Sequence, residues 1–147
     1  MPFVKVYIHF VWSTKKRYPF LDSYELRTMV WNHIKENAVQ KGIFISCVNG
    51  HTDHCHCLVS LCVDQTIQKI MQLIKGECSF WINKQGLTKS KFEWQNEYYA
   101  VAVSENELNR VTNYIHNQER HHRKKTFQNE FDEFIDKYGF ELHKDVE

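Results

Sequence analysis

The sequence predicts an α+β fold in which helices cover one face of an antiparallel sheet and a further helix docks on the other face. Short segments with alternating apolar residues are typical of strands, and longer segments with apolar residues three and four apart are typical of amphipathic helices. The segments follow the order strand, helix, strand, strand, helix, strand, then two helices, which is the ferredoxin-like pattern. The 147 residues, 42% of them hydrophobic, suit a single domain over residues 1–147.

The first strand is expected over residues 3–12, where every second residue is apolar. Its apolar face carries Val4, Val6, Ile8, Phe10 and Trp12, and its polar face carries Lys5, Tyr7 and His9. The first helix is capped by Asp22 or Ser23, with Glu25 as the capping-box partner, and Gly42 ends it. Its apolar stripe consists of Leu26, Met29, Val30, Ile34 and Ala38.

Residues 43–48 and 53–61 are predicted to form a hairpin, with Asn49-Gly50 as the turn signal and residues 51–53 lengthening the turn. Side chains alternate between the two faces of a strand. One face of the later strand carries Cys55, Cys57, Val59 and Leu61, and the other carries His54, His56, Leu58 and Ser60. We assign the cysteine face to the core under the helices and expect the histidine face to be open.

The second helix is expected to start at Asp64, and a polar loop over residues 85–91 and a fourth strand over residues 98–103 follow it. The apolar residues of this helix are Ile67, Ile70, Met71, Ile74, Cys78 and Trp81. Ser104 and Glu107 form a capping box for a helix over about residues 105–120. Thr126 can cap a last amphipathic helix over about residues 126–138. Its apolar residues are Phe127, Phe131, Phe134, Ile135 and Tyr138.

Composition limits the classes of protein that the chain can belong to. No apolar run is long enough to span a membrane and the first residues lack the pattern of a secretory signal, so we expect a cytoplasmic protein. The five cysteines lie in apolar periodic segments, which fits reduced core thiols better than disulfides. The net charge is only +1, but residues 15–17, 84–91 and 120–125 form basic clusters. Such patches set affinity for polyanions, although each could also be a solvated surface.

The two histidines of the predicted third strand stand one pleat apart, roughly 6–7 Å between Cα atoms, so both can reach one divalent ion. On the predicted helix over residues 105–120, Tyr114 and Gln118 lie four residues apart and point the same way, beside an apolar stripe. If this helix docks over the histidine face, it delivers a nucleophile and a weak oxygen ligand. Two imidazoles and one amide leave positions for phosphate oxygens and water on Mg²⁺ or Mn²⁺. A pair of exposed histidines and a packing tyrosine are the simpler alternative.

These residues resemble the motifs of a known family. His54-Cys55-His56 resembles the HUH motif (His, bulky hydrophobic residue, His), and the YIHNQERHH segment over residues 114–122 resembles a tyrosine helix. Residues 9–15 (HFVWSTK), 49–60 and 92–95 (FEWQ) match further motifs. The chain is thus similar to the single-tyrosine HUH transposases of bacterial IS200/IS605-like insertion sequences, including the tyrosine transposases associated with repetitive extragenic palindromes (REP). Cys55 departs from the more usual Val, but it lies on the core face and leaves the metal assignment intact.

The resemblance implies that His54, His56 and Gln118 hold a divalent metal, Mg²⁺ or Mn²⁺, and that Tyr114 is the nucleophile. The implied activity is that of a transposase that cleaves and rejoins single-stranded DNA through a 5′-phosphotyrosine, without a nucleotide cofactor. Because each chain carries one such tyrosine, the resemblance also implies a homodimer, in which the tyrosine helix serves its own metal site or its partner's.

The basic clusters are candidates for binding single-stranded DNA, with hairpin ends, through its phosphates, and Trp94 or Phe92 for stacking on a base. The candidate DNA-binding residues are Lys15, Lys16, Arg17, Lys75, Lys89, Lys91, Trp94, Arg123 and Lys124. His9 and Glu119 are candidates for orienting the metal ligands.

Three alternatives stay open. A non-catalytic nucleic-acid-binding module would stack bases on the open sheet face, where the first strand offers only Tyr7 as an aromatic side chain. A zinc or copper protein would use the His/Cys cluster, and metal content together with the role of Gln118 would distinguish it. A domesticated REP-associated DNA nickase would use the same chemistry without a mobile element, and the neighbouring genome would distinguish it.

Overall fold

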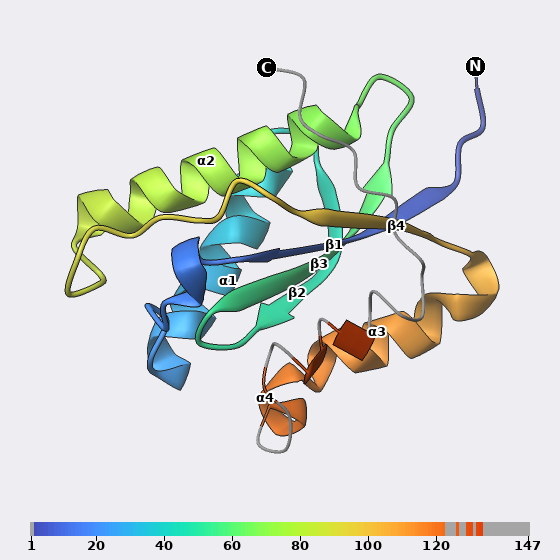
Figure 1. The fold of residues 1–147 in the computed structure, drawn as a ribbon. Coiled ribbons are helices and arrows are strands. Elements are labelled where there is room, and N and C mark those ends of the chain that lie inside the picture. The colour runs from blue at the N-terminus through green and yellow to red at the C-terminus, as the bar shows by residue number, and fades with distance from the viewer. Residues whose placement is uncertain (1, 123–125, 127–128, 131, 134–147) are drawn as a thin grey trace.

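The computed structural model describes residues 2–122, 126, 129–130 and 132–133. Over residues 2–122 it contains the predicted strands and helices in the predicted order (Figure 1). The strands are β1 Val6–Ser13, β2 Phe44–Gly50, β3 His54–Leu61 and β4 Tyr99–Val103. The helices are α1 Tyr24–Gln40, α2 Ile67–Gln85, α3 Leu108–His116 and α4 Gln118–His121, with short 3-10 helices η1 Lys15–Arg17 and η2 Glu105–Glu107.

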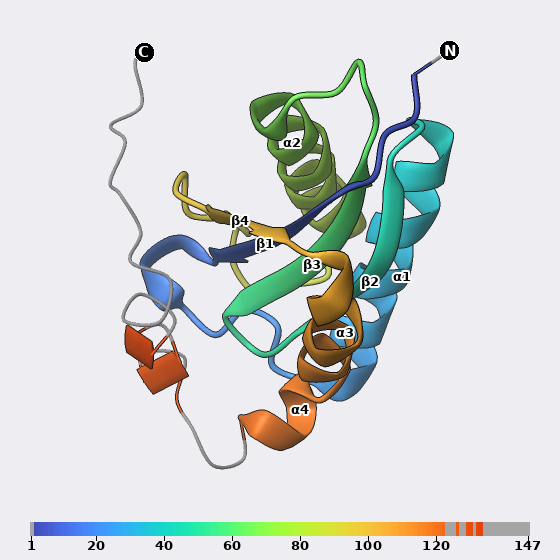
Figure 2. The same ribbon diagram turned by 90° about the vertical axis from the view of Figure 1, so that its right-hand side faces the viewer.

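The four strands form one sheet in the order β2-β3-β1-β4, and every pair of neighbours is antiparallel. This arrangement confirms the predicted ferredoxin-like fold. Two helices, α1 and α2, lie on one side of the sheet, and α3 lies on the other (Figures 1 and 2). The histidine face of β3 is therefore covered by α3 and not by the two long helices.

The main core fills the space between the sheet and the two long helices. Phe10, Cys57 and Val59 point into it from β1 and β3, and Val30 and Ile74 meet them from α1 and α2. The face of β3 that carries the cysteines is thus the core face, as predicted. All five cysteines are free and four of them are buried, which confirms the prediction of reduced core thiols.

A second, smaller apolar cluster holds α3 on the opposite face. Ile115 packs against Leu58 and Cys47, and Tyr114 and Val111 lie at the edge of the cluster. A helix as short as α3 is marginal alone, so this apolar contact stabilises it. Its C-terminal end is fixed as well, because the side-chain amide of Asn49 donates to the carbonyl of His116 at 3.1 Å.

Several predicted element boundaries are wrong. Asn49 and Gly50 belong to β2, and residues 51–53 alone make the turn. The cap of α2 is Thr66 and not Asp64, because the Thr66 hydroxyl accepts from the N–H of Lys69 at 3.1 Å. The predicted Ser104 capping box does not form, and a 3-10 helix over residues 105–107 precedes α3. The predicted helix over residues 105–120 is divided, since Asn117 separates α3 from α4.

The apolar stripe of α1 also differs from the prediction. Met29 is 48% exposed, whereas Arg27 is 6% exposed and faces inward. Thr126 caps the helical residues that follow it, as predicted, since its hydroxyl accepts from the N–H of Asn129 at 3.2 Å and residues 129–130 and 132–133 are helical. The five apolar residues predicted for the last helix lie outside the described residues.

Within the described part of the chain, no helix has the length and apolar character needed to cross a membrane.

Candidate metal and nucleophile site

The two histidines of β3 are fully buried beneath α3. Each has one ring nitrogen held by a neighbour. Nδ1 of His54 lies 2.9 Å from the carboxylate of Asp53, and Nδ1 of His56 lies 3.0 Å from Nε2 of His9. A ligand histidine held at one nitrogen presents the other at a fixed angle. The Nε2 atoms of His54 and His56 are therefore both aimed at the space under α3.

Burial keeps this part of the site neutral. It lowers the pKa of His9 to about 3 and also lowers the pKa of His56, because a charged imidazole loses its hydration there. Neutral His9 can accept the Nδ1 proton of His56, which leaves the Nε2 lone pair of His56 available to a cation. His9 was predicted to orient a metal ligand, and it contacts His56, one of the two candidate ligands on β3.

Helix α3 and the start of α4 bring Tyr114 and Gln118 to the two histidines. Gln118 is fully buried, and its Oε1 lies 3.0 Å from Nε2 of His54. The ring of Tyr114 packs edge-on against His56, with 5.5 Å between ring centroids. The four residues proposed for the site from sequence are therefore neighbours, although the helix that carries Tyr114 ends before Gln118.

Two residues that the sequence analysis did not single out lie at the same place. Glu130 is 3% exposed, and its Oε1 lies 2.9 Å from Nε2 of His56 and accepts the hydroxyl hydrogen of Tyr114. Its Oε2 lies 3.4 Å from Nε2 of His54 and 2.6 Å from Nε2 of His122. His122 follows Gln118 by four residues, a spacing visible in the sequence. No local pattern identifies Glu130.

The charges in this cluster are strongly coupled. Burial opposes ionisation of Glu130, but its contacts with His122 and His56 outweigh burial and hold the pKa of Glu130 below its ordinary value. Burial and the Glu130 carboxylate both raise the pKa of the Tyr114 hydroxyl well above its usual range. In this arrangement Tyr114 is a protonated donor to an ionised carboxylate.

Glu119 has a different position from the predicted one. Its carboxylate makes two contacts with the guanidinium of Arg27, at 2.6 and 2.9 Å, and it contacts His51 at 3.6 Å. Arg27 also donates to the carbonyl of Leu21 at 2.8 Å. Glu119 therefore anchors α4 to α1, and none of these contacts orients a candidate metal ligand.

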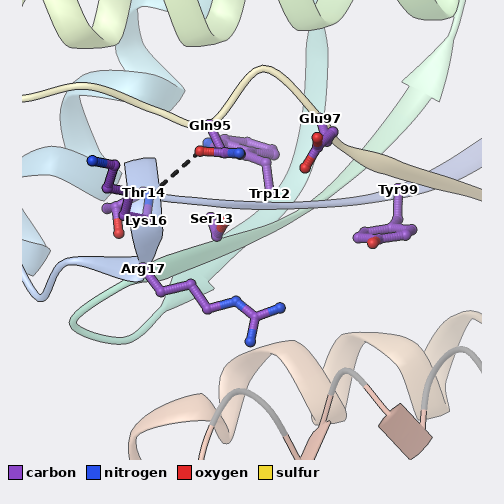
Figure 3. Close-up of a pocket in the computed structure, with 8 residues that line it drawn as sticks. All are labelled: Trp12, Ser13, Thr14, Lys16, Arg17, Gln95, Glu97 and Tyr99. Atoms are coloured by element: carbon purple, nitrogen blue, oxygen red, sulfur yellow. Dashed lines mark hydrogen bonds between the residues drawn. The ribbon is translucent and has the colours of Figure 1, made fainter. Parts of the chain in front are cut away.

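Three of the predicted DNA-binding residues form η1, beside the end of β1. Lys15 contacts Glu93 at 3.3 Å, whereas Lys16 and Arg17 line a pocket of about 310 Å³ that Tyr99 also lines. Arg17 and Tyr99 extend from the sheet toward the side on which α3 and α4 lie (Figure 3). These two side chains therefore lie on the same side of the sheet as the buried histidines.

The other predicted DNA-binding residues are dispersed. Lys75 and Lys91 line a separate pocket beside α2, where Lys75 donates to the carbonyl of Gln95 at 2.6 Å, and Lys89 is exposed in the loop after α2. Trp94 is 8% exposed and packs against Trp12 and Phe92. The expectation that Trp94 or Phe92 offers an open ring to a base is therefore wrong for this conformation, because both rings are in the core. Arg123 and Lys124 lie outside the described residues.

Comparison with known families identifies the chain. The model of a family described as "Transposase IS200 like" matches residues 3–118, which include β1, β3, α3 and, at the last matched position, Gln118. The chain belongs to the IS200-like transposase family. Membership makes this transposase a DNA-cleaving enzyme by class. A comparison with curated proteins finds no match.

Solved structures agree with this assignment at the level of the fold. A candidate transposase from Deinococcus radiodurans is 22% identical, with a TM-score of 0.64 over 80% of this chain and 93% of that one. A REP-associated tyrosine transposase bound to a REP hairpin is 17% identical, with a TM-score of 0.60 over 83% of this chain and 72% of that one.

Proposed function

We propose that this IS200-like transposase cleaves and rejoins single-stranded DNA by metal-assisted transesterification, with Tyr114 as the nucleophile and His54, His56 and Gln118 as ligands of Mg²⁺ or Mn²⁺. One observation carries the proposal: the Tyr114 side chain lies beside three buried ligand atoms that come from two distant segments of the chain. A half-buried tyrosine beside two buried imidazoles and a buried amide oxygen is arranged for chemistry and not only for packing.

The residues fit a divalent ion. Nε2 of His56 is buried and makes no hydrogen bond of good geometry among the described residues, although Oε1 of Glu130 lies 2.9 Å away. An unsatisfied buried nitrogen is costly, and a metal ion would satisfy it. Asp53 and His9 hold the opposite ring nitrogens, as outer partners of metal-binding histidines do. Two imidazoles and one amide oxygen suit Mn²⁺ or Mg²⁺ better than the softer ions that thiolates select, and both cysteines of β3 face the core.

In the proposed reaction the Tyr114 oxygen attacks a DNA phosphorus in line. The bond from phosphorus to the tyrosine oxygen forms while the bond from phosphorus to the 3′ oxygen breaks, which leaves a 5′-phosphotyrosine and a free 3′-hydroxyl. A bound divalent ion would polarise the scissile phosphate and stabilise the leaving oxygen. One phosphodiester replaces another, so a 3′-hydroxyl of a different strand end can reverse the step without ATP.

The DNA would approach along the β4 edge of the sheet, where β1 ends and η1 begins. Arg17 and Lys16 supply positive charge there, and Tyr99, which is only half-buried, replaces Trp94 as the candidate stacking ring. Lys16 and Arg17 have positive φ angles of 56° and 55°, an uncommon backbone conformation that is frequent at functional sites. The related REP transposase is bound to a DNA hairpin, which supports a hairpin as part of the substrate.

A homodimer remains part of the proposal, because one tyrosine per chain can complete two cleavages only if two sites cooperate. The packing of Ile115 against Leu58 of the same chain supports attack by Tyr114 at its own metal site. Light scattering on the free protein and on its DNA complex tests the dimer. A monomer in both states would refute it without affecting the cleavage chemistry.

A denaturing gel tests the chemistry. The purified protein is incubated with Mn²⁺ or Mg²⁺ and with labelled single-stranded DNA from both ends of its own locus. We expect a metal-dependent covalent band that Tyr114→Phe abolishes and Tyr24→Phe retains, since Tyr24 is 62% exposed on α1. Addition of a second strand end should release the adduct as a joined product. A wild-type protein that binds Mn²⁺ but gives no adduct on any strand would overturn the proposal.

A further inference from the structure

We propose that Glu130 is a further ligand of the divalent ion and that the same carboxylate holds the Tyr114 hydroxyl beside it. This inference rests on the proposed function and extends it to a part of the chain that the family match, which ends at residue 118, does not reach. Glu130 itself would then belong to the active site.

The position of the carboxylate is the first argument. Glu130 is almost fully buried, and its two oxygens lie within 3.4 Å of ring nitrogens from His54, His56 and His122. The amide nitrogen of Gln118 lies 3.4 Å from the same carboxylate. Glu130 therefore lies at the centre of the candidate ligands, where a carboxylate is the hard oxygen donor that Mg²⁺ and Mn²⁺ prefer.

The spacing of the donor atoms is the second argument. One ligand atom from each of His54, His122 and Glu130 can be chosen so that all lie within 4.8 Å of one another. Atoms that coordinate one ion at about 2.1 Å are separated by roughly 3–4 Å, so only small side-chain movements would close this set around an ion. Both oxygens of Glu130 lie against imidazole nitrogens, Oε1 at 2.9 Å from Nε2 of His56 and Oε2 at 2.6 Å from Nε2 of His122.

Charge is the third argument. A buried carboxylate needs a compensating positive charge, and the ring nitrogens of His54, His56 and His122 around Glu130 carry none unless they are protonated. A divalent ion would supply that charge while also satisfying the imidazole nitrogens. The N–H of Glu130 donates to the carbonyl of Thr126 at 3.1 Å, and this bond holds the backbone that carries the carboxylate.

The contact with Tyr114 gives the same residue a second role. The Tyr114 hydroxyl donates to Oε1 of Glu130, and the tyrosine ring lies edge-on to both His56 and His9. One carboxylate thereby links the nucleophile to the candidate ligand set. Glu130 acts here as a positioning residue for the tyrosine and as a direct ligand for the ion.

The experiment measures Mn²⁺ binding without DNA, by electron paramagnetic resonance of free Mn²⁺, on chelator-treated full-length protein. The variants are Glu130→Ala, Glu130→Gln, His54→Ala and, as the matched control, Asp132→Asn, an exposed acid in the same segment. We expect one site in the wild type, at least tenfold weaker binding in both Glu130 variants, loss of binding in His54→Ala and no change in Asp132→Asn. Circular dichroism in chelator establishes that each variant is folded.

If Glu130→Ala is unfolded, the test uses Glu130→Gln. Mn²⁺ should then raise the melting temperature of Glu130→Gln by less than it raises that of the wild type. Wild-type affinity in the Glu130 variants, with binding abolished in His54→Ala, would overturn the inference and leave the proposed metal site intact. An affinity that neither the Glu130 variants nor His54→Ala changes would overturn both. The Tyr114 adduct assay remains a separate test of the cleavage chemistry.

Discussion

Gly50→Ala should disrupt the strand that carries both histidines. Gly50 is buried at the end of β2, where it pairs with Cys55. A Cβ atom at this position would lie 2.1 Å from the carbonyl oxygen of His54 and 2.9 Å from Cα of Cys55. That oxygen already accepts from the N–H of His51 at 3.1 Å, which closes the turn between β2 and β3. Both clashes are with backbone, so no side-chain rotation can relieve them.

Overpacking a core usually costs about 1–3 kcal/mol even when side chains can adjust, so we expect a loss of at least ~3 kcal/mol here. For a chain of this size that corresponds to a fall of roughly 6–12 °C in melting temperature. The matched control is Gly76→Ala on α2, where no atom lies within 4 Å of the added methyl group. Helix propensity should make that variant about 0.5–1 kcal/mol more stable than the wild type.

Thermal and urea unfolding followed by circular dichroism measure both variants, and Mn²⁺ binding measures the effect on the site. Gly50→Ala should also bind Mn²⁺ more weakly, because relief of the clash displaces the backbone of His54. A Gly50→Ala protein with the melting temperature of the wild type, or a Gly76→Ala protein destabilised by the same amount, would refute the reasoning.

Three further predictions concern other parts of the site and core. Arg27→Met should lower the free energy of unfolding, measured in urea, by about 2 kcal/mol, because it leaves the Glu119 carboxylate without its guanidinium partner. The double variant Arg27→Met/Glu119→Gln should recover part of that loss. Metal-free protein should lose stability as the pH falls below about 6.5, because His9 takes up a proton there in the unfolded chain but, with its pKa at about 3, stays neutral in the fold. Urea unfolding at pH 7 and at pH 5 measures the sign of this change. His9→Asn should make the free energy of unfolding depend less on pH. A chromogenic thiol reagent at neutral pH should label half-buried Cys62 first, and rapid reaction of all five cysteines in the folded protein would contradict the described core.

Local periodicity was sufficient to predict the central part of the site. Alternation along β3 separates the histidines from the cysteines whatever the partners of the strand, and an interval of four residues places Tyr114 and Gln118 on neighbouring turns. The helix break at Asn117 did not spoil this prediction, because Gln118 Nε2 still reaches the carbonyl of Tyr114 at 3.3 Å. The faces of β3 and of the tyrosine helix could therefore be predicted from local spacing, although the caps and ends of several helices could not.

Contacts between distant segments were beyond such reasoning. Arg27 is buried only because Glu119, in α4, meets it across the fold, so a helical pattern in α1 gave no reason to prefer it to Met29. Asn49-Gly50 is a common turn pair, yet here the asparagine side chain binds the end of α3 and the glycine makes room for the backbone of β3. Glu130 reaches the histidines from a segment whose own pattern predicts only packing.

The two halves of the candidate site consequently differ in how firmly the fold holds them. His54 and His56 belong to a strand paired on both sides, with β1 and β2, and their backbone cannot move without breaking the sheet. Gln118 and Glu130 follow β4 on short elements, held by a small apolar cluster, by the Arg27–Glu119 pair and by the site itself. A divalent ion bound by both halves would connect the half that carries the Tyr114 nucleophile to the half that the sheet holds in place. Removing an oxygen ligand, Gln118 or Glu130, should therefore loosen the connection between the two halves while the sheet still holds His54 and His56 in place.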